Sequence, residues 1–327
     1  MTSLASTMPG EFGRTRAPGF LSRHLREISV AIAYALLLAS LALRQAGFFQ
    51  GQFFATWVSA APVLVAATGM TLVILARHID ISIGSQFAVC AVLSGLLAKT
   101  GMPMPAVVIA TVLIGATLGA INGAFVAGMG LPSIVVTLAT MVIFRESLRW
   151  ARQGQFVRDL PAGYQWFGLS QRAGQWAVLL GALLVLAAFA WAMRWLAAGR
   201  AVYAVGSDRE AARLAGIRPA RVVFVVFVLM GALVGLAAIL NAVRFADVDP
   251  NVGTGWELQV IAAVVVGGAA ISGGRGTLVG SLIGVALLAT IGPALVFLKV
   301  PSQWEKAIQG VIILVAVASD GLHRRAR

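Results

Sequence analysis

The chain has 327 residues, of which 59% are hydrophobic and 11% charged, and its formal net charge is +13. A soluble domain carries about a quarter charged residues, so this composition excludes a soluble enzyme and indicates an integral membrane protein. The cationic side chains lie mostly in short segments between apolar runs and at the termini. This pattern is typical of membrane orientation and argues against nucleic-acid binding.

The chain contains one cysteine, Cys90, and three scattered histidines. Cys90 lies within an apolar run, where a thiol packs as a small hydrophobic side chain. A single cysteine excludes an intramolecular disulfide, and the histidine spacing predicts no metal site. We therefore expect no metal, no bound cofactor and no catalytic residue in this chain.

Residues 1–27 are polar and carry four arginines, and an apolar run begins at Ile28. A cleaved signal peptide has a shorter basic region and small residues directly after its apolar core. Here Leu43-Arg44-Gln45 follows the apolar run instead. We expect a polar N-terminal tail and then an uncleaved first span.

Apolar segments that approach the length of a bilayer span recur along the whole chain. A helix needs about 20 apolar residues to cross the hydrocarbon core. The eighth segment is too short, which predicts a broken or re-entrant helix. The expected fold is an all-α integral membrane protein, a polytopic bundle of about ten transmembrane helices, some of them short or broken. The predicted spans are 28–46, 55–76, 79–98, 104–128, 132–150, 175–197, 221–243, 257–271, 276–298 and 303–319.

An even number of spans places both termini on one side of the membrane. If that side is the cytoplasm, 15 of the 25 Lys and Arg residues lie inside, a modest bias in the expected direction. The predicted organisation has three parts, in which the middle one includes a cytoplasmic loop. They are a cytoplasmic tail, 1–27, a transmembrane domain, 28–320, with its loop at 198–220, and a cytoplasmic tail, 321–327.

A polar turn at 76–85 separates the second and third apolar runs. The side chains of Asp80, Ser82 and Ser85, with Gly84, are expected to cap the helix that follows by accepting hydrogen bonds from free backbone N–H groups. The alternative is that these groups line a translocation path, because ionisable groups at membrane depth are functional candidates.

Five of the ten Lys and Arg residues predicted outside lie between the fifth and sixth spans, in 145–174. Glu146 is spaced to pair with Arg149 at i, i+3. The segment is either an interfacial polar loop or a basic surface on which an acidic partner docks. The docking candidates are Arg149, Arg152 and Arg158.

A polar segment, 199–217, lies between two long hydrophobic segments and predicts a short amphipathic helix followed by a glycine. Asp208 and Glu210 near its start, with Arg213 further on, favour a helix. The segment either lies on the membrane surface or places its small residues in a groove of another protein. The small residues that would suit such a groove are Ala211, Ala212, Leu214 and Ala215.

Several further polar and glycine residues have both a structural and a functional interpretation. Asn122 and Asn241 lie inside spans, where they either bond neighbouring helices or contact a transported sugar. Glu257 is expected at a helix start, since no histidine or nucleophile completes an acid–base site with it. Gly267 and Gly268 are expected to let helices approach or break.

The glycine-rich segment 267–277 lacks the Lys-[Ser/Thr] pair of a phosphate-binding loop, so the chain is not expected to hydrolyse ATP. It also faintly resembles the segment 69–85. Repeated halves are common in transporters, and this weak similarity hints at two related halves without fixing their symmetry.

Taken together, five ordered blocks resemble the permease subunits of bacterial ABC importers for monosaccharides, the ribose, arabinose, rhamnose and autoinducer-2 group. The similarity extends from about residue 28 to 320. Where many relatives have Gly-Gly-Ile-Asp, this chain has Arg77-His78-Ile79-Asp80, closest to the rhamnose and autoinducer-2 branches. The blocks are 78–85, 131–138, 199–217, 255–268 and 304–320.

This resemblance implies a permease of the bacterial inner membrane that works as a dimer with a second copy or a paralogue. Two cytoplasmic ATPase subunits would bind ATP and Mg, and a periplasmic binding protein would deliver the sugar. The segment 199–217 would be the coupling helix. By this resemblance, the residues that couple it to the ATPase would be Gly199, Arg200, Gly206, Glu210, Ala211, Ala212, Arg213 and Gly216, with Gly206, Glu210, Ala211, Ala212 and Gly216 in the contact itself. Transport would proceed by alternating access.

Two other classes remain as alternatives. A secondary transporter or channel usually needs intramembrane carboxylates for ion coupling, and only Asp80, Glu146 and Glu257 are candidates here. An ABC permease for an amino acid would share the architecture and differ in its cargo.

Overall fold

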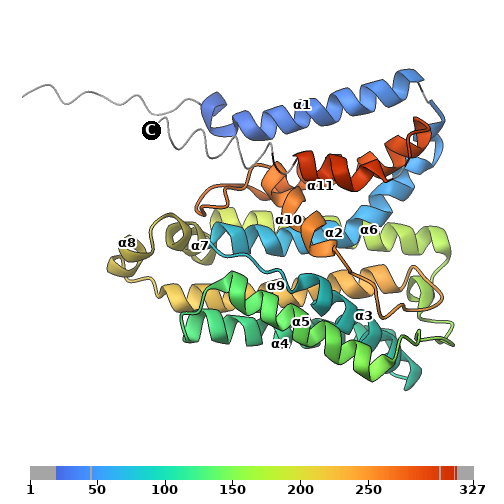
Figure 1. The fold of residues 1–327 in the computed structure, drawn as a ribbon, viewed down its shortest axis with the longest axis horizontal. Coiled ribbons are helices and arrows are strands. Elements are labelled where there is room, and N and C mark those ends of the chain that lie inside the picture. Colours follow the sequence, from blue (N-terminus) through green and yellow to red (C-terminus); the bar gives the residue numbers. More distant parts are fainter. Residues whose placement is uncertain (1–19, 45, 302, 313, 315–327) are drawn as a thin grey trace, which may run out of the picture.

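The computed structural model describes residues 20–44, 46–301, 303–312 and 314. Figure 1 shows long helices lying side by side in a bundle. The described residues contain helices and one isolated antiparallel bridge, between Val157 and Val248. The all-α polytopic fold is thus confirmed. The α-helices are α1 (Phe20–Arg44), α2 (Gln52–Leu75), α3 (Ile83–Lys99), α4 (Met104–Gly123), α5 (Ser133–Arg152), α6 (Gln171–Trp195), α7 (Ala197–Ser207), α8 (Arg209–Leu214), α9 (Pro219–Ala242), α10 (Trp256–Val266) and α11 (Leu278–Phe297).

Five of the described helices are long and apolar enough to cross a membrane: α2, α4 with the π-helix η2 (Ala124–Gly128), α6, α9 and α11. Helix α5 has 20 residues, but Arg145, Glu146, Arg149 and Arg152 make its second half polar. Helices α1, α3 and α10 have shorter apolar stretches. The expectation that some spans are short is therefore confirmed.

The ends of the chain differ from the predicted boundaries. Helix α1 begins at Phe20, eight residues before the expected start at Ile28, because polar residues can extend a helix beyond its apolar part. Residues 304–312 are helical, which agrees with the start of the predicted span 303–319. The rest of that span and the predicted tail 321–327 lie outside the described residues.

The two short helices α3 and α10 begin close to one another inside the bundle. The rings of Phe87 and Trp256, near the two N-termini, have centroids 4.1 Å apart. A Cβ on Gly84 would meet the carbonyl oxygen of Gly253 and the carboxylate of Glu257, so the backbones approach closely. The chain reaches α3 through the non-helical residues 76–82, and it leaves α10 through the non-helical residues 267–277.

Helices α4 and α9 pack through glycines. Gly115 and Gly119 on α4 face Gly231 and Gly235 on α9, and an added Cβ at any of the four would meet the backbone of the other helix. Glycines four residues apart lie on one face of a helix and let two backbones come together. The spacing is a packing signal present in the sequence itself, and none of the predictions from the sequence included it.

Helices α7 and α8 lie together at one end of the bundle, which we call the α8 end, and α8 projects furthest from it (Figure 1). The predicted amphipathic helix over 199–217 is in fact two helices. They separate at Asp208, whose extended backbone ends α7 and whose carboxylate accepts hydrogen bonds from the N–H groups of Glu210 and Ala211 at the start of α8. The expected glycine follows, because Gly216 has φ 82°.

Candidate translocation and coupling sites

A buried polar cluster lies where the chain turns from α2 into α3. The Asp80 side chain is 0% exposed, and its Oδ1 accepts hydrogen bonds from the Ser82 backbone N–H (2.9 Å) and hydroxyl (2.6 Å). The Ser82 oxygen in turn accepts from the amides of Gln86 (2.7 Å) and Asn122 (2.8 Å). The cluster therefore joins the turn to both α3 and α4.

The capping prediction is only partly right. Asp80 does accept a backbone N–H bond, but the Ser82 and Ser85 hydroxyls donate, to Asp80 and to the Ser82 carbonyl, and do not cap the helix. Gln86, which was not among the residues predicted from the sequence, completes the cluster.

Two oxygen atoms in this cluster lack a partner. Gln86 Oε1 and Asn122 Oδ1 are buried and accept no hydrogen bond from any described residue. Buried polar atoms are nearly always paired, so these two acceptors are candidates for hydrogen bonds from further donors. Asn122 bonds α4 to the turn before α3, which is close to the helix-bonding role that one interpretation of the sequence gave it.

Replacing Asp80 with alanine is expected to destabilise the protein. The change removes the carboxylate that accepts from the Ser82 N–H and hydroxyl, and it leaves the Gln86 and Asn122 amides with the Ser82 oxygen alone, at a cost of roughly 3 kcal/mol in this buried site. Thermal unfolding in detergent should therefore occur about 10 °C lower. The control is Asp247→Ala, at an exposed carboxylate, which should leave the midpoint unchanged. Equal midpoints for the two variants would contradict the structural importance of the cluster.

Arg145 lies in the segment 145–174 that was predicted outside, but it is half-buried and bonds to backbone carbonyls of other elements. Its guanidinium donates to the carbonyls of Gly84 and Val252, each at 3.0 Å, and interacts electrostatically with Glu257. Glu257 lies in the first turn of α10, as expected. Arg145 thus ties α5 to the place where α3 and α10 begin.

Gly267 and Gly268 have a structural role at the end of α10. Gly268 has φ 99°, and a Cβ on Gly267 would meet the carbonyl oxygen of Gly280 on α11. The two glycines therefore end one helix and let it pack against the next, which confirms the interpretation of close approach.

The α7–α8 segment has a buried side and an exposed side. Gly199, Gly206 and Ala212 are buried within this chain, so they are not surface contact residues, contrary to the expectation for these three. Helix burial, which depends on packing with distant elements, was not readable from the local sequence. Arg200, Glu210, Ala211, Arg213 and Gly216 are exposed, as is Leu214, at 80%.

The buried side of α7 contacts two other elements at the α8 end. A Cβ on Gly206 would meet the carbonyl oxygen of Leu75 at the end of α2, and that oxygen accepts a hydrogen bond from Gly274 N–H (2.9 Å). The Tyr203 hydroxyl donates to the Gly276 carbonyl (2.9 Å). Movement of α7 would therefore act directly on α2 and on the 267–277 loop that links α10 to α11.

A basic pocket of about 320 Å³ lies beside α8, with Arg77, His78 and Arg209 in its lining. Burial, with a smaller contribution from the Arg209 charge, lowers the pKa of His78 to about 4. His78 is therefore neutral at pH 7, and the positive charge of this pocket comes from the two arginines.

The predicted docking arginines lie at the end opposite α8, and each has a local partner. Arg149 pairs with Glu146 at 2.7 Å, as predicted. Arg152 donates to the carbonyls of Gln155 and Phe156, and the Arg158 guanidinium lies 5.9 Å from the centroid of the Phe156 ring. Their charges are exposed or half-exposed, so the surface remains basic.

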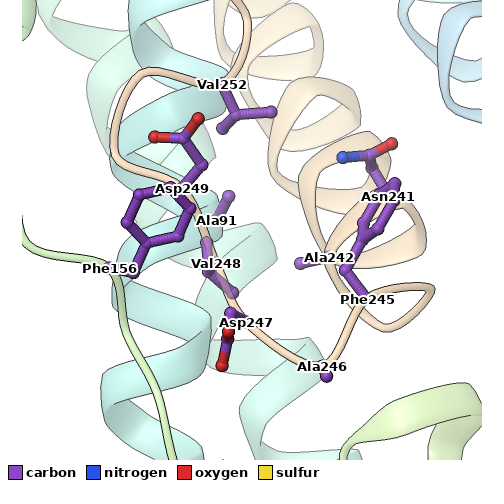
Figure 2. Close-up of a pocket in the computed structure, with 10 residues that line it drawn as sticks. All are labelled: Ala91, Phe156, Asn241, Ala242, Phe245, Ala246, Asp247, Val248, Asp249 and Val252. Carbon is purple, nitrogen blue, oxygen red and sulfur yellow. The ribbon is translucent and has the colours of Figure 1, made fainter.

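Asn241 does not lie with the Asp80 cluster. It lines a separate pocket of about 390 Å³ between the end of α9 and the start of the 243–255 loop, shown in Figure 2. The pocket also contains Phe156 and Phe245, which no motif in the sequence singled out. The signal that could have found these two residues is the presence of an aromatic side chain within a polar loop.

Comparison with known proteins gives concordant matches. Residues 52–317 match the family model described as branched-chain amino acid transport system / permease component. The chain is 34% identical over 302 residues to the autoinducer 2 import system permease protein LsrC of Escherichia coli (strain K12 / DH10B), covering 92% of this chain and 88% of the relative. The same-named protein of Salmonella typhi is 34% identical over 308 residues, covering 92% and 87%. That of Salmonella paratyphi B is 36% identical over 274 residues, covering 82% and 78%. No solved structure gives a significant match.

Proposed function

We propose that this chain, which belongs to the branched-chain amino acid transport system / permease component family, is the membrane permease of an ATP-driven importer. We propose a monosaccharide as its cargo. The relatives named above are autoinducer 2 import permeases, which supports an autoinducer-2-like or similar sugar as the cargo. The cargo crosses the bacterial inner membrane by alternating access.

The observation that carries this proposal is the two-sided α7–α8 segment. Its buried side contacts α2 and the 267–277 loop, and its exposed side presents Glu210, Ala211 and Leu214 at the end of the bundle. A secondary transporter does not need such a segment. An ATPase subunit that drives transport needs a surface on the permease that it can contact and move. The proposal places the α8 end and both termini in the cytoplasm, where a separate ATPase binds ATP and Mg.

The same family membership supports a proposal for the remaining partners. A periplasmic sugar-binding protein docks at the opposite end, on the surface that carries Arg149, Arg152 and Arg158, and a second permease copy or a paralogue completes the transporter. The Asp80 cluster, with its unpaired acceptors on Gln86 and Asn122, offers hydrogen bonds to sugar hydroxyl groups when the path opens.

Two matched charge reversals test the motor contact. Glu210–Arg213 and Glu146–Arg149 are both exposed i, i+3 ion pairs, at the α8 end and near the opposite end of the bundle. Glu210→Arg places like charges together and alters the proposed ATPase contact, so ATPase recovery on purification of the co-expressed complex should fall about tenfold. Glu146→Arg should leave that recovery unchanged. ATPase recovery that is equal in the two variants, or absent even from the wild type, would refute the proposal.

A further inference from the structure

The pocket in Figure 2 has two aromatic walls. Phe156 and Phe245 lie on opposite sides of it, with Asp249 near Phe156 and Asn241 beside Phe245. Ala91 of α3 contributes to the lining. Its volume of about 390 Å³ lies within the usual range for small-molecule sites, about 300–1,000 Å³.

Each aromatic ring has an arginine beside it. The guanidinium carbon of Arg158 lies 5.9 Å from the Phe156 ring centroid, and that of Arg244 lies 5.4 Å from the Phe245 centroid. Arg152 also binds the Phe156 carbonyl oxygen at 3.1 Å.

The polar groups in the lining are acceptors and an amide. Asp247 is exposed and Asp249 half-buried, and one oxygen of Asp249 already accepts the Asn251 N–H (2.8 Å). The ten residues labelled in Figure 2 include no Lys or Arg. Carboxylates accept hydrogen bonds from hydroxyl groups, whereas the lining itself offers no cation to pair with the carboxylate of an amino acid, since Arg158 and Arg244 lie beside the rings and not in the lining.

We infer that this pocket is the site where the permease first holds its cargo, and that it takes a neutral, polyhydroxylated molecule of monosaccharide size. The apolar face of a sugar ring packs against Phe245 and Phe156, and its hydroxyl groups donate to Asp247 and Asp249. The pocket lies at the end opposite α8, where the proposed function places the delivering protein, and the inference rests on that proposal.

The test is saturation-transfer NMR on the purified full chain in detergent, which detects weak binding. D-ribose and L-rhamnose are the sugar probes, and L-leucine is the amino-acid probe. We expect transfer to the sugars and none to leucine. Phe245→Ala should weaken sugar binding about tenfold, because an aromatic contact contributes up to about 1.5 kcal/mol. Phe245→Tyr should retain binding. The matched control is Phe125→Ala on η2, since Phe125 and Phe245 are similarly exposed, 41% and 49%.

Three outcomes would overturn the inference: transfer to leucine but not to the sugars, no transfer to any probe, or sugar transfer that Phe245→Ala leaves unchanged. Size-exclusion profiles of each variant establish that the protein is folded. ATPase recovery does not depend on this pocket. Retained ATPase with no sugar binding would therefore reject the site alone, and sugar binding without an ATPase would reject the proposed motor.

Discussion

Gly206→Val is expected to abolish transport while leaving the bundle folded. Even a single Cβ at this position collides with the carbonyl oxygen of Leu75, so a valine must push α7 away from the end of α2. The Gly274 N–H bond to the same oxygen and the Tyr203 bond to Gly276 would be disturbed together. Uptake of labelled sugar into proteoliposomes containing the whole transporter should fall to background.

The exposed side of α8 is unchanged in this variant, so the ATPase should still co-purify. Its hydrolysis would no longer be converted into transport. The control is Gly181→Val on α6, where nothing lies within 4 Å of an added Cβ, and it should transport normally. Normal uptake by the Gly206 variant would show that α7 does not transmit the motor's movement.

Gly231→Leu is expected to prevent formation of the native bundle. An added Cβ here meets the carbonyl oxygen of Gly115 and the backbone of Gly119, and the larger side chain must separate α4 from α9. Overpacking of this kind costs about 3 kcal/mol, and in a bilayer no hydrophobic effect drives the two helices back together. Fluorescence-detected size exclusion should show loss of the monodisperse peak.

The matched control for this second change is Gly181→Leu, which adds the same side chain to a helix surface with open space. It should give a monodisperse peak of normal height. A normal peak from Gly231→Leu would mean that the α4–α9 contact does not hold the fold together.

Hydropathy predicted the helices well, because spans are set by apolar length. The short eighth span is α10, and the Glu146–Arg149 pair forms as its spacing indicated. The sequence located the start of α8 less well, because Asp208 both ends α7 and begins α8. Local chemistry favoured a helix there and did not locate the break.

The roles of buried residues could not be predicted from local pattern. Gly206 has the same sequence context as a surface glycine, and only its contact with Leu75, far away in the chain, makes it an internal residue. Arg145 looked like one of several outer cations, yet its guanidinium binds the carbonyls of Gly84 and Val252. Such assignments need the tertiary partner, which periodicity does not contain.

Helices α3 and α10 are each too short to cross the membrane alone. At 1.5 Å per residue, the 17 residues of α3 are about 26 Å long and the 11 of α10 about 17 Å, both short of the roughly 30 Å hydrocarbon core. Neither helix alone extends from one face of the hydrocarbon core to the other. Each covers part of that thickness, and the two meet at the junction of Gly84, Gly253 and Glu257, where Arg145 donates to the carbonyls of Gly84 and Val252.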